Sequence, residues 1–297
     1  MTEPILFPNT HPLPRPTADN LPHILPQLLR VQSIERYPAA GGLVLNRATL
    51  FHDAATLRTE WTCLHPDIRI TRGGLVSIRW SGRPMSVDGC VHINRLVLME
   101  RPRPEVNLFQ TVPMAWVKDR ELLQRASTLW ESLPRGFRHL LNSMFWDGRR
   151  FQRYLMGPSS LQNHHNDING NFRHSVEVAE QAQSMARGRD RVHVPIAVLG
   201  GLIHDAGKAD EYKFNRVLGH FEMSSDGCLV GHRDRLLHWI GAAMAAHRVI
   251  IPEAHYLGLL HALTATRGAP KWLGLREPRS LEPHAAPPPL TSERESP

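Results

Sequence analysis

A chain of 297 residues, 41% of them hydrophobic, is long enough to bury a sizeable core and to form two modest domains. Arginine supplies most of a formal net charge of +7, and its planar guanidinium suits the recognition of phosphate groups. We expect a cytoplasmic protein with reduced thiols and no membrane partner. The sequence has no apolar signal segment, no run of ~18 apolar residues and no CxxC pair among its three cysteines.

The first 110 residues are predicted to form an arm and a small β domain. Prolines recur from Pro4 to Pro26, which excludes a long helix and suggests an extended arm over residues 1–40. Residues 41–110 show short β-like segments with regular turn signals, a pattern typical of a small sandwich or barrel. Because the strands fit into about sixty residues, an OB-like, nucleic-acid-binding barrel is the economical choice. The expected strands cover 43–50, 56–63, 75–80 and 91–99.

Helical periodicity replaces the β pattern from residue 116 onward. We expect a helical connector over 111–160, an all-α domain over 161–275 and a disordered tail over 276–297. The expected fold class is therefore α+β, with a small N-terminal barrel followed by a helical domain. The expected helices cover 121–130, 134–145, 174–187, 194–207, 231–247 and 252–266.

The doublet His204-Asp205 follows a long apolar run and is the most informative feature of the sequence. A carboxylate at the end of a buried helix needs a compensating partner, and a metal ion bound by carboxylate and imidazole is a usual one. His174, His232 and His247 also lie at the ends of apolar helix faces, where ligands from several helices converge. Any one of these histidines alone is more simply interpreted as hydrogen-bonded, but together with the doublet they predict a metal site.

Candidate substrate contacts fall into two groups. Near the doublet, Lys208 is either a phosphate contact or an exposed lysine, and His164-His165 either lines a cleft or forms a polar loop. Arg173 is a further candidate phosphate contact, although an exposed arginine is the simpler interpretation. In the expected barrel, a basic and aromatic strip could bind single strands, with Trp80 equally able to join the core. This strip consists of Arg47, Arg58, Arg79 and Trp80.

The order of these motifs resembles that of HD-domain phosphohydrolases, specifically the YhaM-type 3′→5′ exoribonucleases. That family joins an N-terminal OB-like domain to a C-terminal helical HD domain, and the resemblance here runs from about Leu43 to His261. It is carried by Asn163-His164-His165, by His174, and by the segments 202–208, 227–232, 246–247 and 260–261.

The resemblance implies a metal-dependent 3′→5′ exonuclease that acts on single-stranded RNA, with DNA as a further substrate class. It implies one or two divalent ions, Mn²⁺ first and Fe, Ni, Co or Zn as the others. Asp205 would be the catalytic carboxylate that bridges the ions, and Lys208 would neutralise charge on the phosphate. His174 and His204 would hold one ion, and His232 and His247 the other.

The sequence departs from this family where the last helix should carry an aspartate, because Thr264 stands three residues after His261. Threonine is a poor metal ligand, and Asp210, Glu211 and His261 are the nearby candidates that could replace it. Two alternatives therefore stay open. One is an HD phosphohydrolase for a small nucleotide, and the other is a catalytically impaired protein that binds nucleic acid. Whether the chain forms a homo-oligomer is also left open.

Overall fold

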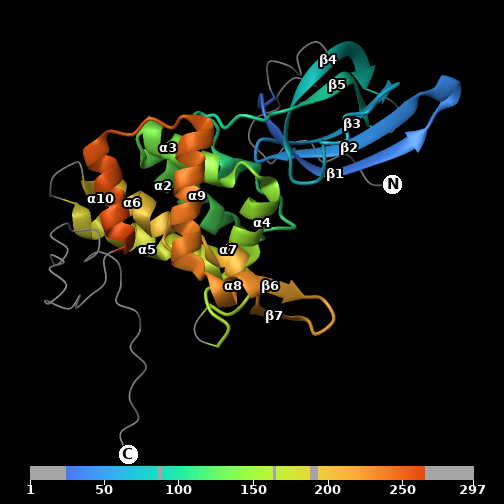
Figure 1. The fold of residues 1–297 in the computed structure, drawn as a ribbon. Helices are drawn as coiled ribbons and strands as arrows, with labels where there is room; N and C mark the ends of the chain where they lie inside the picture. Colours follow the sequence, from blue (N-terminus) through green and yellow to red (C-terminus); the bar gives the residue numbers. More distant parts are fainter. Residues whose placement is uncertain (1–24, 86–88, 163–164, 188–192, 265–297) are drawn as a thin grey trace, which may run out of the picture.

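The computed structural model describes residues 25–85, 89–162, 165–187 and 193–264. They form a closed β-barrel followed by a helical part, which lie side by side in Figure 1. The α+β fold class expected from the sequence is therefore confirmed.

The barrel is built from five strands in the order β1-β2-β3-β5-β4, and β4 pairs with β1 to close it. All strand pairs are antiparallel except β3 with β5, which is parallel. This arrangement fits the OB-like barrel expected from the sequence. The strands are β1 (Leu29–Pro38), β2 (Val44–His52), β3 (Ala55–Cys63), β4 (Leu75–Met85) and β5 (Val91–Leu98).

Alternation of apolar and polar residues explains why these segments are barrel strands. Along β3, Leu57 and Trp61 are buried inside the barrel, whereas Arg58 between them is exposed. Trp61 is thus a core residue, and Trp80 packs only partly buried against that core. Four strands match the expected segments, and β1 is an addition.

Strand β1 corrects the expected boundary of the N-terminal arm. The arm was assigned to residues 1–40, but the barrel begins at Leu29 within that range. The strand was missed because its second half alternates weakly, with charged and polar residues between few apolar ones. The proline-rich residues 1–24 lie outside the described residues.

The helical part confirms the six expected helices, with small changes at their ends, and adds a further helix over 148–156, two very short helices and a hairpin. Its longer helices are α2 (Arg120–Ser132), α3 (Arg135–Phe145), α4 (Gly148–Met156), α5 (Gly170–Ala186), α6 (His193–Ile203), α9 (His232–His247) and α10 (Glu253–Thr264). Between α6 and α9 lie α7 (Lys208–Glu211), the hairpin β6 (Tyr212–Asn215) and β7 (His220–Met223), and α8 (Ser225–Leu229). The hairpin projects from the helical part in Figure 1. The tail over 276–297 lies outside the described residues.

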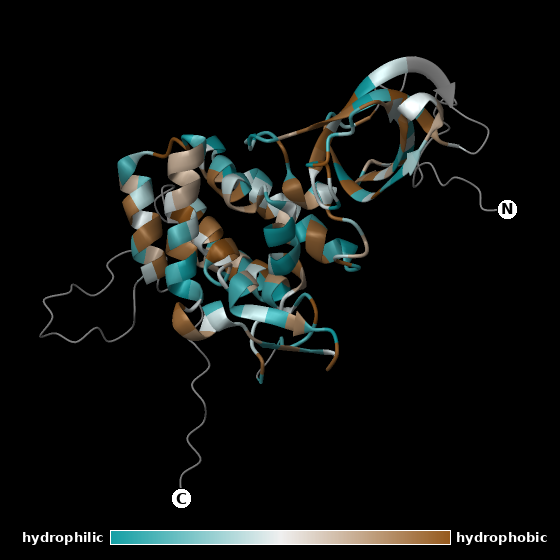
Figure 2. Ribbon diagram, turned by 45° about the vertical axis from the view of Figure 1, so that its right-hand side comes forward, coloured by the Kyte–Doolittle hydropathy of each residue, from teal (hydrophilic) through white to brown (hydrophobic). Residues whose placement is uncertain are grey.

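Helix α6 is the centre of the helical core, and hydrophobic residues gather around it in Figure 2. Its residues 196–203 are all buried, as expected for a helix that is apolar on every side. Side chains from α2, α3 and α4 belong to this same core, so the expected connector over 111–160 is part of the helical domain. None of the helices in the described residues is long and apolar enough to cross a bilayer.

Arg30 of β1 joins the barrel to the helical part and is completely buried. Its guanidinium donates to the carbonyl of Gly73 at 2.7 Å and to the hydroxyl and carbonyl oxygens of Thr111 at 2.8–3.1 Å. The same group lies 5.1 Å from the ring centroid of Trp116 and 5.2 Å from that of Phe151. Burial lowers the pKa of Arg30 to about 9, and no carboxylate among the described residues pairs with it. Neutral acceptors and aromatic faces therefore hold this charge in the interface.

The variant Arg30→Met tests this interface, because it keeps the apolar volume and removes every donor. We expect the free energy of unfolding to fall by about 3 kcal/mol, since buried carbonyl oxygens are left without partners. Urea unfolding followed by two spectroscopic probes measures the change. Arg47→Met is the matched control, because the exposed Arg47–Glu60 ion pair should contribute less than about 1 kcal/mol. Equal losses in the two variants would contradict the role of Arg30.

Candidate metal centre

Three segments bring four of the expected metal ligands together. His174 lies near the start of α5, His204 and Asp205 directly follow α6, and His232 is the first residue of α9. Helices α5 and α6 pack closely where Gly201 meets α5, because a Cβ at this glycine would lie 2.5 Å from the Cα of Ala179. The glycine thereby lets His174 and His204 approach each other.

Three imidazoles surround the carboxylate of Asp205. The Nε2 atoms of His204 and His174 lie 3.4 Å and 3.8 Å from Asp205 Oδ2, and 3.3 Å from each other. His232 Nε2 approaches the other oxygen, Oδ1, at 3.5 Å. The structure thus brings together four of the five expected metal ligands, and His174, His204 and Asp205 form a group that could hold an ion.

Asp205 is ionised although it is only 7% exposed. Burial opposes its ionisation, but the proximity of His204, of Lys208 and of His232 outweighs burial and holds the pKa of Asp205 below its usual range. Lys208 Nζ donates to Asp205 Oδ2 at 2.6 Å. Burial, followed by the proximity of His204, lowers the pKa of His174 to about 4. His174 is therefore a neutral imidazole near pH 7, the form that binds metals.

Hydrogen bonds behind the imidazoles fix the direction of their Nε2 atoms. His204 Nδ1–H donates to the Gly201 carbonyl at 2.8 Å, which leaves the Nε2 lone pair free to bind. His232 Nδ1–H donates to the buried carboxylate of Glu211 at 2.6 Å. The sequence offered Glu211 only as one of three replacement ligands, and the structure places it behind His232 instead. No sequence signal distinguishes it from its neighbour Asp210, which pairs with Arg153 at 2.6 Å.

His247 does not belong to this centre, and the expected pairing of His232 with His247 on a second ion is wrong. The two residues are the ends of helix α9. Fifteen residues at 1.5 Å per residue separate them by about 22 Å along the helix axis. His247 instead lies near His139 of α3, whose pKa is lowered by burial and then by the proximity of His247.

Thr264 is also outside the centre. Its exposed hydroxyl donates to the Leu260 carbonyl of its own helix at 2.8 Å. The cluster around Asp205 therefore forms without a contribution from this position.

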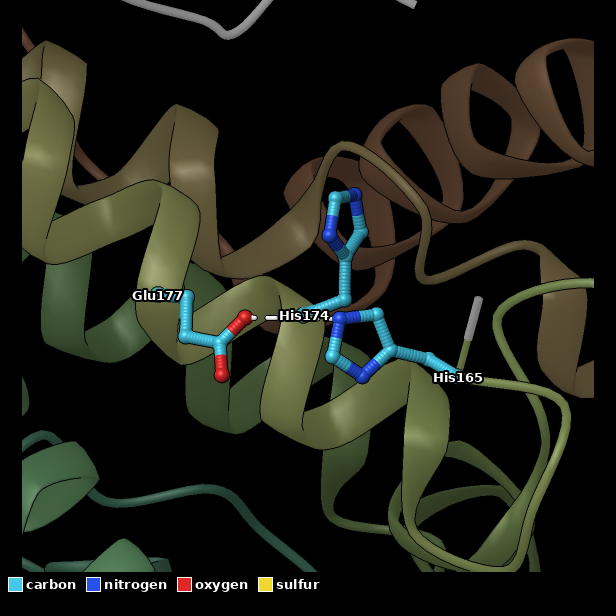
Figure 3. A group of neighbouring side chains, drawn as sticks. All are labelled: His165, His174 and Glu177. Atoms are coloured by element: carbon cyan, nitrogen blue, oxygen red, sulfur yellow. Dashed lines mark ion pairs between the residues drawn. The ribbon is translucent and has the colours of Figure 1, made fainter. Parts of the chain in front are cut away.

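His165 stands beside His174 in a constrained loop (Figure 3). Its backbone φ of 61° is in the left-handed region, and Gly170 packs so closely that a Cβ there would lie 2.0 Å from the His165 carbonyl oxygen. His165 Nε2 lies 3.5 Å from Glu177 Oε2, and the rings of His165 and His174 are 5.8 Å apart. His164 lies outside the described residues, and Arg173 forms an ion pair with Asp167 at 3.3 Å.

His165, His174 and Glu177 form a second group that could hold a metal ion. A neutral imidazole has one lone-pair nitrogen, so His174 can serve only one of the two groups. The group around Asp205 includes a buried and ionised carboxylate, whereas Glu177 is exposed. The Asp205 group is therefore the better metal site.

The expected basic strip on the barrel is divided by the strand order. Arg47 and Arg58 are exposed on the neighbouring strands β2 and β3, and Arg47 pairs with Glu60 at 3.1 Å. Arg79 and Trp80 lie on β4, which β5 separates from β3 and β1 separates from β2. The four residues thus form two surfaces and not one continuous strip.

Fold and site together define an α+β protein with an OB-like barrel and a helical part that contains a cluster of half-buried histidines around one buried aspartate. Comparisons with protein-family models, with curated proteins and with solved structures find no match to this chain. Any assignment to a family therefore rests on the motif order and on this geometry.

Substitutions at two adjacent glycines of α6 test the packing that creates the centre. Gly201→Ala should lower the free energy of unfolding by about 2 kcal/mol and weaken Mn²⁺ binding, because the methyl group forces α5 away. Gly200→Ala is the matched control, since nothing lies within 4 Å of its Cβ, and it should gain up to about 1 kcal/mol of helix propensity. Urea unfolding and titration calorimetry with MnCl₂ measure both effects, and similar behaviour of the two variants would exclude this packing role.

A second pair of variants tests which histidine of α9 belongs to the centre. His232→Ala should weaken Mn²⁺ binding by about tenfold or more, because it removes an imidazole beside Asp205. His247→Ala should change the affinity by less than about twofold, since the two residues lie about 22 Å apart. Titration calorimetry gives both dissociation constants. A larger loss for His247→Ala would mean that α9 presents its other end to the ion.

Proposed function

We propose that this protein is a metal-dependent phosphohydrolase that removes nucleotides from the 3′ end of single-stranded RNA. The observation that carries the proposal is the convergence of His174, His204 and His232 on the buried carboxylate of Asp205. This arrangement supports hydrolysis of a phosphate ester. The resemblance to YhaM-type exoribonucleases supports the choice of RNA and of the 3′ end.

The donor set fits a divalent transition-metal ion. Imidazole nitrogens with one carboxylate suit Mn, Fe, Co, Ni or Zn, and we propose Mn²⁺ as the first candidate. His174, His204 and Asp205 would hold the ion, with His232 completing the shell. A bound ion supplies a Lewis acid that polarises the phosphoryl group and lowers the pKa of water.

Other residues around the cluster would position the substrate and the ligands. The ammonium group of Lys208, beside Asp205 Oδ2, would neutralise charge that develops on a phosphate. Asn171 donates from Nδ2 to the Asp205 carbonyl at 3.4 Å and holds the backbone of the doublet in place. His165 forms one wall beside His174, where it would contact the strand.

One contact favours a second candidate, a protein that binds nucleic acid without cleaving it. Lys208 Nζ lies 2.6 Å from Asp205 Oδ2 and compensates the buried charge without an ion. An ammonium in this position competes with a metal ion for the same oxygen. The two candidates differ in turnover, so an activity measurement separates them.

The direct test is a time course of the full chain on 5′-labelled single-stranded RNA with Mn²⁺. We expect a ladder that shortens from the 3′ end, and no shortening with the double variant His204→Ala/Asp205→Ala, which removes two ligands. Thr264→Asp is the matched control and should leave the rate within about twofold, because Thr264 is exposed and its hydroxyl is bonded to its own helix.

Three other outcomes have distinct meanings. Intact RNA with the wild-type chain that nevertheless binds the strand would favour the binding protein. Cleavage of mononucleotides but not of RNA would favour a small-nucleotide phosphohydrolase. Activity that appears only in Thr264→Asp would mean that the wild-type centre is incomplete.

A further inference from the structure

A hollow on the barrel, separate from the metal centre, has a composition suited to a charged and aromatic ligand. It has a volume of about 470 Å³ and lies over strands β4 and β5. Its lining consists of Ile78, Arg79, Trp80, Asn94 and Arg95. A neighbouring hollow of about 290 Å³ shares Ile78, Arg79 and Trp80 and extends to Gln27, Met99 and Arg103.

Two arginines face each other across the floor of this hollow. Arg79 of β4 and Arg95 of β5 are directly opposite partners in the antiparallel ladder. Like charges at opposite positions destabilise a sheet. Among the described residues, no carboxylate forms an ion pair with either arginine. The barrel therefore keeps an unfavourable charge pair that an anionic ligand would neutralise.

Two other arginines of the barrel have carboxylate partners. Arg47 pairs with Glu60 across β2 and β3, and Arg69 pairs with Asp67 and Glu100. What distinguishes the Arg79–Arg95 pair is that two arginines lie directly opposite each other in the ladder, with no carboxylate of the described residues in an ion pair with either.

A β-bulge shapes the same surface. Arg79 pairs with Arg95 and Trp80 pairs with Ile93, so Asn94 is an extra residue in β5. As a result, the consecutive residues Asn94 and Arg95 are both exposed beside Trp80. Trp80 packs partly on the barrel core and also lines both hollows, which places an aromatic ring beside two guanidinium groups.

The second hollow continues this surface toward Arg103, in the segment that leads from β5 to the helical part. Arg103 is exposed, and no described carboxylate forms an ion pair with it. Three arginines and an aromatic ring thus line two hollows that share residues, and single-strand binding uses this combination of positive charge and stacking surface.

We propose that the groove formed by Arg79, Trp80, Asn94, Arg95 and Arg103 binds a single-stranded nucleic acid, with phosphates on the arginines and a base on Trp80. The choice of RNA as the strand rests on the proposed function, whereas the groove itself rests on the barrel surface. The strand would therefore cross β4 and β5, and Arg47 and Arg58 on β2 and β3 would lie off its path.

The test measures binding of the full chain with Mn²⁺ to a fluorescent oligouridylate whose phosphorothioate linkages resist hydrolysis. Arg79→Gln/Arg95→Gln should raise the dissociation constant by about tenfold or more and lower the salt dependence by about 0.7 for each lost phosphate contact. Arg47→Gln/Arg58→Gln is the matched control with the same loss of charge, and it should change the constant by less than about threefold.

Melting temperature separates a lost contact from a damaged fold. The Arg79→Gln/Arg95→Gln variant should melt no lower than the wild type, because the substitution relieves like-charge repulsion. A loss of affinity that is equal in both double variants, or that is larger for Arg47→Gln/Arg58→Gln, would overturn the proposal. Competition by inorganic tripolyphosphate as effective as that by the oligonucleotide would also overturn it, since the groove would then be a simple anion site.

The failure of this inference differs from the failure of the proposed function. If a strand binds in the groove but is never shortened, the result would support the groove and contradict the proposed hydrolase activity. If Arg79→Gln/Arg95→Gln shortens the strand at an unchanged rate and binds it with unchanged affinity, the result would support the hydrolase activity and contradict the groove.

Discussion

The ionised carboxylate of Asp205 lies at the end of the most apolar of the described helices, and three segments of the helical part bring side chains to it. An isolated buried carboxylate is too costly to keep, so the chain must bring compensating groups to it. His174 comes from α5, Lys208 from the start of α7 and His232 from the start of α9. Each of these segments is thus positioned by its contact with the Asp205 carboxylate as well as by apolar packing. The close approach at Gly201 is the steric condition that makes this possible.

At the junction with the barrel, Arg30 is a buried cation that also needs compensating partners. Its compensation comes from neutral oxygens of Gly73 and Thr111 and from aromatic faces. Because these partners belong to a turn before β4 and to the segment before α2, a single side chain joins both parts of the protein. The barrel and the helical part are therefore held on one connected framework, which the proposed guidance of a strand toward a hydrolytic site would require.

The sequence predicted the features that depend on local pattern. Alternation identified strands β2 to β5, and the His204-Asp205 doublet after an apolar run identified the core of the centre. It did not determine which end of a helix faces the site, because His232 and His247 both end the same apolar stretch. Only the packing of α7 against α9 decides that His232 meets Asp205 and that Glu211 supports it. The prediction of one continuous basic strip on the barrel was wrong for a similar reason. The order of the strands depends on how the barrel closes, and the periodicity of the sequence does not reveal it.

Among the described residues, two departures from local rules lie at the proposed sites. His165 adopts a left-handed backbone beside the metal centre, and Arg79 faces Arg95 across two barrel strands. Residues under such strain concentrate at functional sites, because a ligand supplies there the energy that the free protein lacks. One of these places could accommodate the reacting end of a strand, and the other its more distant phosphates. Hydrolysis and strand binding would then draw on opposite charge arrangements: a buried anion that collects cations, and exposed cations that lack an anion.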